Sequence, residues 1–87
     1  PLSVESEINK IIEFYEPMAS DEGVKIEVNL QPDLHLRAEK TLFQRAVSNV
    51  VSNAINYTPK GGLIRVEAFS KGDTVQISVM DTGVGIP

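Results

Sequence analysis

The hydrophobic residues of the chain follow two different spacings, and the order of these spacings constrains the fold more than any other feature. Residues 3–19 and 39–57 repeat apolar side chains every three or four positions, as one face of an α-helix requires. Four segments instead alternate apolar and polar side chains, as half-buried strands do: residues 24–30, 34–37, 63–69 and 74–80. The order helix-strand-strand-helix-strand-strand predicts an α+β fold, a two-layer sandwich with the helices on one face of a sheet.

Capping and turn residues mark the ends of these elements. Ser3 is a candidate N-cap for the first helix and Gly23 a stop signal, whereas Pro17 is expected to end or kink that helix one turn early. Ser70-Lys71-Gly72-Asp73 predicts an antiparallel hairpin between the last two strands. Lys60-Gly61-Gly62 reads as a turn that ends the second helix, although a loop approaching a phosphate is an alternative.

The same patterns predict which side chains are buried. On the second helix, the expected core face consists of Phe43, Val47, Val50 and Ala54, widened by Ala46 and Val51. On the first helix, four glutamates are interpreted as the solvated face: Glu5, Glu7, Glu13 and Glu16. His35, between two leucines, is expected to be an exposed or edge-strand residue.

Composition excludes several classes of function. The 87 residues form one small domain at most, or part of a larger one, and both ends look cut. A net charge of −4 without a basic run argues against nucleic acid or an anionic membrane as the main partner. The absence of cysteine removes disulfides and thiolate-bound zinc and is compatible with a reducing cytosol.

Three asparagines form one stripe on the second helix. At about 100° per residue, Asn49, Asn53 and Asn56 lie within roughly 60° of one another. Asparagine is a poor helix former, about 0.6 kcal/mol worse than alanine at an interior position. The stripe can be a plain solvent face. Alternatively, its amide oxygens can serve a hard cation such as Mg²⁺, which prefers oxygen ligands and shares them with phosphates.

A glycine-containing segment follows the last strand. Asp81-Thr82-Gly83-Val84-Gly85-Ile86-Pro87 permits sharp turning and close approach of the backbone to a ligand. Taken alone, it also fits an ordinary strand-ending turn. A dinucleotide-binding interpretation fails because a third glycine, a following helix and a downstream acid are all missing from the sequence.

Together, SNVVSNAINYTPKGG and VMDTGVGIP resemble the N box and the first glycine box of the ATP-binding domain of sensor histidine kinases. That domain belongs to the superfamily that includes gyrase, Hsp90 and MutL ATPases. The resemblance extends upstream to LFQRAVSNVVSNAINYTP and YEPMASDEGVKIEV, and so covers essentially the whole chain. The latter segment is also similar to copper- and silver-responsive sensor kinases.

The resemblance implies ATP and Mg²⁺ as ligands and assigns roles to individual residues. Asn53 matches the Mg²⁺ ligand. Asn49 matches the residue beside the phosphates and the metal-bound water, the one catalytic candidate in the chain. Tyr57 matches a ring that lines the nucleotide pocket, and Asp81 the carboxylate that accepts a hydrogen bond from the adenine amino group. Three further positions match residues that approach the base: Gly83, Gly85 and Ile86.

Two departures from the family qualify this interpretation. Asn56 stands where many relatives carry a basic residue that contacts phosphate. In addition, the family's fold continues past the first glycine box, so residues 1–87 are expected to be the N-terminal part of the domain, truncated there. An exposed sheet edge or apolar face in such a part predicts self-association or poor order near residues 81–87.

The implied function is transfer of the ATP γ-phosphoryl group to a histidine on a separate dimerisation and phosphoacceptor helical domain, followed by signalling to a response regulator. This places the domain in the cytoplasm, as part of a membrane sensor, and the segment alone is expected to have no autokinase activity. Two alternatives remain open: another ATPase of the superfamily, such as an anti-sigma-factor kinase, and a non-enzymatic interaction module with the same fold.

Overall fold

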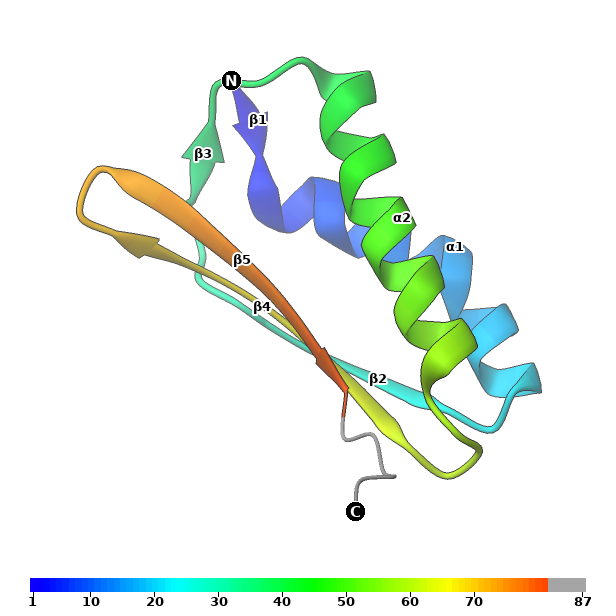
Figure 1. Cartoon of the computed structure of the whole chain (residues 1–87). Helices are drawn as coiled ribbons and strands as arrows, with labels where there is room; N and C mark the ends of the chain where they lie inside the picture. The colour runs from blue at the N-terminus through cyan, green and yellow to red at the C-terminus, as the bar shows by residue number, and fades with distance from the viewer. Residues whose placement is uncertain (82–87) are drawn as a thin grey trace.

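The computed structural model of the chain describes residues 1–81 and contains two helices packed on one face of a three-stranded sheet (Figure 1). The helices are α1 (Val4–Asp21) and α2 (Lys40–Tyr57). The sheet consists of β2 (Lys25–Leu30), β4 (Leu63–Lys71) and β5 (Thr74–Asp81). The predicted α+β two-layer sandwich is therefore confirmed, together with the order of its main elements.

The strands of the larger sheet lie in the order β2-β4-β5. β2 and β4 are parallel, with Ile26 opposite Ile64, and β4 and β5 form the predicted antiparallel hairpin. The hairpin closes through Gly72 and Asp73, and Gly72 takes a φ of 62°, a conformation that glycine adopts without strain. The register of the hairpin places Asp81, the last residue of β5, opposite Ile64.

A second, two-stranded sheet lies beside the N-terminus. Its strands β1 (Leu2–Ser3) and β3 (His35–Leu36) pair antiparallel. β1 was not predicted, because two residues are too few to show the alternation that marks a strand. β3 was predicted, but it is shorter than the expected segment 34–37. His35 is exposed, as expected, and its Nδ1 lies 3.2 Å from the carbonyl oxygen of Asp33.

Helix α1 begins as predicted but ends later. The backbone N–H of Ser6 donates to Ser3 Oγ at 3.3 Å, which confirms the N-cap. The prediction that Pro17 ends the helix early is wrong, because α1 continues through Pro17 to Asp21. Proline removes one backbone hydrogen bond. The turn beyond it is held by Ala19, which is buried and accepts a hydrogen bond from Val24 N–H at 2.9 Å.

The core lies between the two helices and the covered face of the sheet. Its fully buried side chains come from every main layer: Ile8 of α1, Val51 and Ile55 of α2, and Ile64 and Val66 of β4. The expected core face of α2 is partly wrong. Val50 is 49% exposed and Ala46 is exposed, whereas Ile55, absent from the expected face, is 1% exposed. The core therefore faces the helix along the row Phe43, Val47, Val51 and Ile55.

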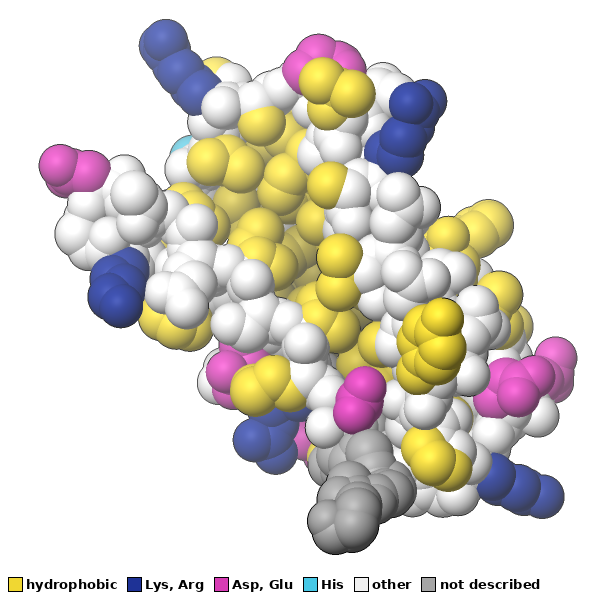
Figure 2. All heavy atoms as spheres, viewed as in Figure 1, with side chains coloured by type: hydrophobic (Ala, Val, Ile, Leu, Met, Phe, Trp, Pro, Cys, Tyr) yellow, Lys and Arg dark blue, Asp and Glu magenta, His cyan; other side chains and the backbone are white. Residues whose placement is uncertain are grey.

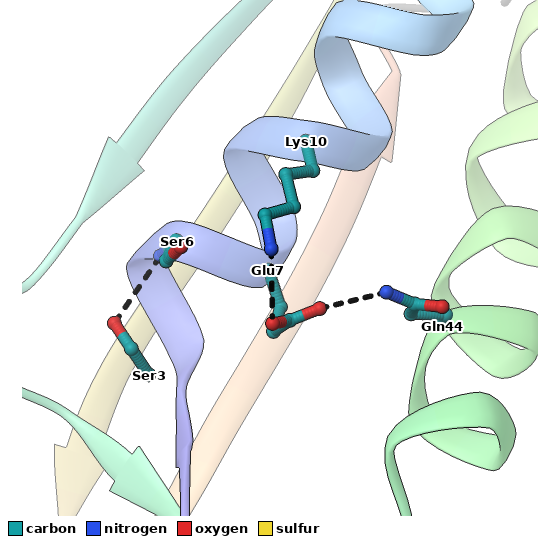
Figure 3. Close-up of polar contacts among 5 residues, drawn as sticks. All are labelled: Ser3, Ser6, Glu7, Lys10 and Gln44. Atoms are coloured by element: carbon teal, nitrogen blue, oxygen red, sulfur yellow. Dashed lines mark hydrogen bonds and ion pairs between the residues drawn. The ribbon is translucent and has the colours of Figure 1, made fainter.

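The seam between α1 and α2 contains a buried carboxylate (Figure 3). Glu7 was expected in the solvated face with Glu5, Glu13 and Glu16; those three are exposed, but Glu7 is only 6% exposed. Gln44 Nε2 donates to Glu7 Oε1 at 2.8 Å, and Lys10 Nζ lies 3.6 Å from Glu7 Oε2. The expectation failed because Gln44 is distant in sequence and gives no local signal.

These contacts keep the carboxylate ionised. The hydrogen bond from Gln44 lowers the pKa of Glu7 below its ordinary value, the positive charges of Lys10 and Lys40 act in the same direction, and desolvation partly opposes them. Glu7 of α1 is thus ionised, and its hydrogen bond with Gln44 connects the two helices.

Candidate nucleotide site

Helix α2 carries the asparagine stripe on an exposed face. Its N-terminus is capped by Glu39, whose carboxylate accepts the N–H groups of Thr41 at 3.1 Å and Leu42 at 3.2 Å. Asn49, Asn53 and Asn56 are all exposed, so none of them is a core residue. The structure therefore keeps the three amides available to a ligand on one side of a rigid helix.

An apolar cavity of about 340 Å³ opens between α2 and β5, beside the stripe. Figure 2 shows hydrophobic side chains gathered in this hollow on the face turned to the viewer. Its lining is entirely apolar and comes from β3, α2 and β5: Leu36, Phe43, Ala46, Val47, Val50, Ile77 and Val79. Ala46 and Val50 stand one helical turn from Asn49 and Asn53, so the apolar wall and the amides adjoin on one helix surface.

Asp81 lies at the end of the β5 row that lines this cavity. Alternate residues of a strand face the same way, so Ile77, Val79 and Asp81 share one face of the sheet. The register gives the direction of that face, because Asp81 is opposite Ile64, which is fully buried beneath the helices. Asp81 itself is exposed, and it also borders a recess of about 240 Å³ with Leu63, Arg65 and Met80.

The remaining predicted site residues are placed in part. Tyr57 is the last residue of α2 and is 80% exposed. The C-terminal ends of α2 and β5 lie at the same end of the molecule (Figure 1). Asn49, Asn53 and Tyr57 therefore lie on α2 and Asp81 on the facing strand β5, and none of these four residues lines the cavity itself. Gly83, Gly85 and Ile86, and the expectation about order near residues 81–87, lie outside the described residues apart from Asp81.

The donor set suits a magnesium ion that is shared with phosphate. Within residues 1–81, no group of three or more acidic or histidine side chains could enclose a metal alone. Exposed amide oxygens on α2 can supply one or two oxygen ligands, and Mg²⁺ commonly takes its remaining ligands from waters and phosphates. A neutral ligand also avoids repelling those phosphates. The residues present therefore fit Mg²⁺ bound together with a nucleotide.

Sequence reasoning missed the second apolar side of α2. Ala46 and Val50 were assigned to the core, but they line the open cavity. The available signal was the width of the apolar arc, because residues 43–55 are apolar over more of the helix than one packed face requires. Periodicity gives the width of such an arc but not which part is covered.

The arrangement of these elements is that of histidine kinase catalytic domains. The catalytic domain of histidine kinase ThkA superposes with a TM-score of 0.90 at 23% sequence identity, covering 99% of this chain and 60% of that one. The mycobacterial sensor histidine kinase MprB superposes with a TM-score of 0.82 at 27% identity, covering 99% of this chain and 56% of that one.

Sequence comparison gives the family. Residues 38–87 match the family described as histidine kinase-, DNA gyrase B-, and HSP90-like ATPase. The chain therefore belongs to this family of ATPases, as its two motifs had indicated. It is 40% identical over 85 residues to the sensor protein IrlS of Burkholderia pseudomallei, and 32% identical over 85 residues to the sensor histidine kinase CusS of Escherichia coli.

The chain corresponds to a limited part of these relatives. It spans 18% of the length of IrlS and 18% of the length of CusS, although 98% of the chain is aligned to each. Neither α1 nor α2, the helices described within residues 1–81, is long and apolar enough to cross a membrane. The similarity of the segment around Tyr15 to copper- and silver-responsive kinases stays a prediction.

Proposed function

We propose that the chain provides the adenine- and metal-binding half of an ATP site in a sensor histidine kinase of a two-component system. One observation carries this proposal. Helix α2 presents Asn49 and Asn53 directly beside an apolar cavity, and the facing strand ends in Asp81 on the same side of the sheet. An apolar slot, a carboxylate and a row of amides suit the base, its exocyclic amine and the phosphates, respectively.

The cavity and Asp81 would recognise the base. A volume of about 340 Å³ is within the range of roughly 300–1,000 Å³ usual for ligand sites, and its apolar walls can sandwich a flat ring. The Asp81 carboxylate accepts hydrogen bonds, so it favours a base with an amino group and rejects one with a carbonyl oxygen there. Tyr57, exposed at the end of α2, would cover the ring on the solvent side, and Gly83, Gly85 and Ile86 would approach it from beyond Asp81.

The asparagines would hold the phosphate end. Asn53 is proposed as the Mg²⁺ ligand through its side-chain oxygen, and Asn49 as the residue that orients the phosphates and a metal-bound water. Bound Mg²⁺ neutralises charge on the phosphates during phosphoryl transfer. Asn56 can donate a hydrogen bond from its amide but carries no positive charge, so it offers less to a phosphate than a basic residue at that place.

In the intact protein, a histidine nitrogen of a dimerisation and phosphoacceptor domain would attack the γ-phosphorus while the bond to the ADP oxygen breaks. A response regulator would then take the phosphoryl group. ThkA, whose catalytic domain shares this fold, has been captured in complex with the response regulator TrrA. This role places the domain in the cytoplasm. The chain alone should show no phosphate incorporation, because the histidine that accepts the phosphoryl group belongs to the separate helical domain; His35, the only histidine of residues 1–87, is an exposed residue of the short strand β3.

Thermal unfolding with Mg²⁺-ATP tests the proposal. Ligand at 100 times its dissociation constant should stabilise the chain by about 2.7 kcal/mol, visible as a rise in Tm. Asn53→Ala should abolish the part of the shift that requires Mg²⁺, whereas Gln76→Ala, an exposed change on the opposite face of β5, should leave it intact. Absence of any shift with millimolar Mg²⁺-ATP in a folded sample would contradict the proposal for this chain.

A further inference from the structure

The two edges of the larger sheet differ in how they are protected. In the order β2-β4-β5, each outer strand pairs with β4 and with no other strand described within residues 1–81. Natural proteins usually protect such an edge with charged side chains, proline or a bulge. β2 carries exposed Lys25 and Glu27, whereas positions 74–80 of β5 contain no charged residue, proline or glycine. β5 is therefore the edge that is open to pairing with a further strand.

The helix-covered face of β5 is apolar and only half-buried. Ile77 and Val79 line the open cavity together with the exposed residues Ala46 and Val50 of α2 (Figure 2). A strand added beside β5 would extend the sheet next to these side chains and remove apolar surface from water. The free edge and the open apolar surface thus adjoin, and one partner can cover parts of both.

A second copy of β5 is complementary to this edge. In an antiparallel pair related by a two-fold axis, residues directly opposite each other point to the same face of the joined sheet. With Ser78 on the axis, Ser78 is opposite itself, and Ile77 is opposite Val79 of the second copy. With Ile77 on the axis instead, Asp73 would be opposite Asp81 of the second copy, and like charges in that position are unfavourable. Charge therefore selects the pairing centred on Ser78.

We propose that the free edge of β5 is a dimerisation surface, on which a second copy of the chain pairs antiparallel with Ser78 at the two-fold axis. The two three-stranded sheets then form one continuous sheet, and the helices of both copies lie on the same face of it. The pairing assigns the self-association expected from the sequence to one edge and one register. It does not depend on the proposed nucleotide site.

A single introduced cysteine tests the register, because the chain contains no cysteine of its own. Directly opposite residues of an antiparallel pair have Cα atoms about 4.5–5.5 Å apart, within the roughly 4.4–6.8 Å that a disulfide spans. Ser78→Cys should therefore give a disulfide-linked dimer on air oxidation, seen by non-reducing electrophoresis. Asn29→Cys is the matched control, since Asn29 and Ser78 both lie opposite Glu67, on the two outer strands. Equal crosslinking of the two variants would overturn the proposal.

Sedimentation equilibrium measures the association itself. Ser78→Lys brings two positive charges together at the axis and should weaken dimerisation by at least about tenfold. Asn29→Lys adds the same charge beside the same Glu67 on the other edge and should leave dimerisation unchanged. Circular dichroism checks that each variant is folded. A folded wild-type chain that stays monomeric at millimolar concentration would overturn the proposal and leave the edge to a strand of another kind, as would equal weakening by the two lysine variants.

Discussion

Helix α2 has two apolar sides, one buried in the core and the other open to solvent. On one side, Val51 and Ile55 are 0% and 1% exposed, packed against α1 and the sheet. On the other, Val50 is 49% exposed and, with Ala46, lines the open cavity facing β5. The same helix and the same residue types thus form a closed seam toward α1 and an open cleft toward β5.

Polar contacts follow the same division. At the closed seam, the buried Glu7 is connected to the half-buried Gln44 of α2 and to the exposed Lys10 of α1 (Figure 3). The lining of the open cleft contains no polar side chain, and its polar groups stand at the rim, as Asn49 and Asn53 on the helix and Asp81 at the strand end. A polar contact inside a seam fixes two helices to each other. Polar groups around an apolar hollow remain available to something that enters it.

The two sides of α2 therefore differ in role: the closed side stabilises the fold, and the open side is the one proposed to bind a ligand. The closed side carries the stability of residues 1–81, because burial of apolar surface is the main favourable term in folding. The open side leaves apolar surface in water, which is unfavourable unless a ligand or further protein covers it. The chain spans only 60% of the ThkA catalytic domain, so both kinds of cover are compatible with membership of the family.

The largest effect should come from truncating the closed side. Ile55→Ala removes most of a fully buried side chain and should destabilise the chain by about 2–5 kcal/mol, since the surrounding core cannot collapse completely into the space. Val50→Ala is the matched change on the open side, one and a half turns away, and should change stability by less than about 1 kcal/mol. Urea unfolding midpoints measure both, and similar losses would show that the cleft is closed in solution.

A smaller effect is expected at the hydrogen bond between Glu7 and Gln44 in the seam. Gln44→Ala leaves the buried Glu7 carboxylate without its shortest hydrogen bond and should cost about 1–3 kcal/mol. Gln76→Ala, an exposed change to the same residue type on β5, provides the control. Equal midpoints for the two variants would mean that Glu7 is adequately solvated without Gln44.

The buried Glu7 carboxylate also predicts that the stability of the chain depends on pH. The pKa of Glu7 is lowered in the folded chain, chiefly by Gln44, so the folded state favours the ionised form. Its contribution to stability is present above the ordinary carboxyl pKa and is lost as the pH falls through the lowered pKa of the folded state. Glu7→Gln should therefore reduce the decrease in stability measured between about pH 7 and about pH 3. An unchanged acid profile would show that other carboxylates account for it.

The division explains what could be read from the sequence. Element order, the hairpin and the buried face of β4 were predictable because they depend on local periodicity and turn chemistry. The burial of Glu7 was not, because it depends on Gln44, 37 residues away. The split of the α2 arc into closed and open sides depends on where α1 and β5 lie, and one-dimensional periodicity contains no such information.

For the candidate site too, local motifs were predictable from the sequence and burial set by distant residues was not. The motifs predict Asn49, Asn53 and Asp81 as site residues, and the hairpin register places Asp81 on the helix-covered face of the sheet. The burial of Thr58 was not predictable, because nothing in the sequence shows that a helix-ending threonine is buried while its neighbours Tyr57 and Pro59 are exposed.

The smallest effect on stability should be a gain at the rim of the open side. Asn53 is exposed in the interior of α2, with no hydrogen bond from its side chain to the rest of residues 1–81. Asn53→Ala should therefore stabilise the chain by about 0.6 kcal/mol, the difference in helix propensity, while removing the proposed Mg²⁺ ligand. Ser48→Ala, five residues earlier on a half-buried face of the same helix, is the control for a general alanine effect. A variant that is more stable without ligand but no longer stabilised by Mg²⁺-ATP would show that the asparagine is retained for binding. A loss of stability without ligand would instead assign Asn53 to the fold and place it with the closed side.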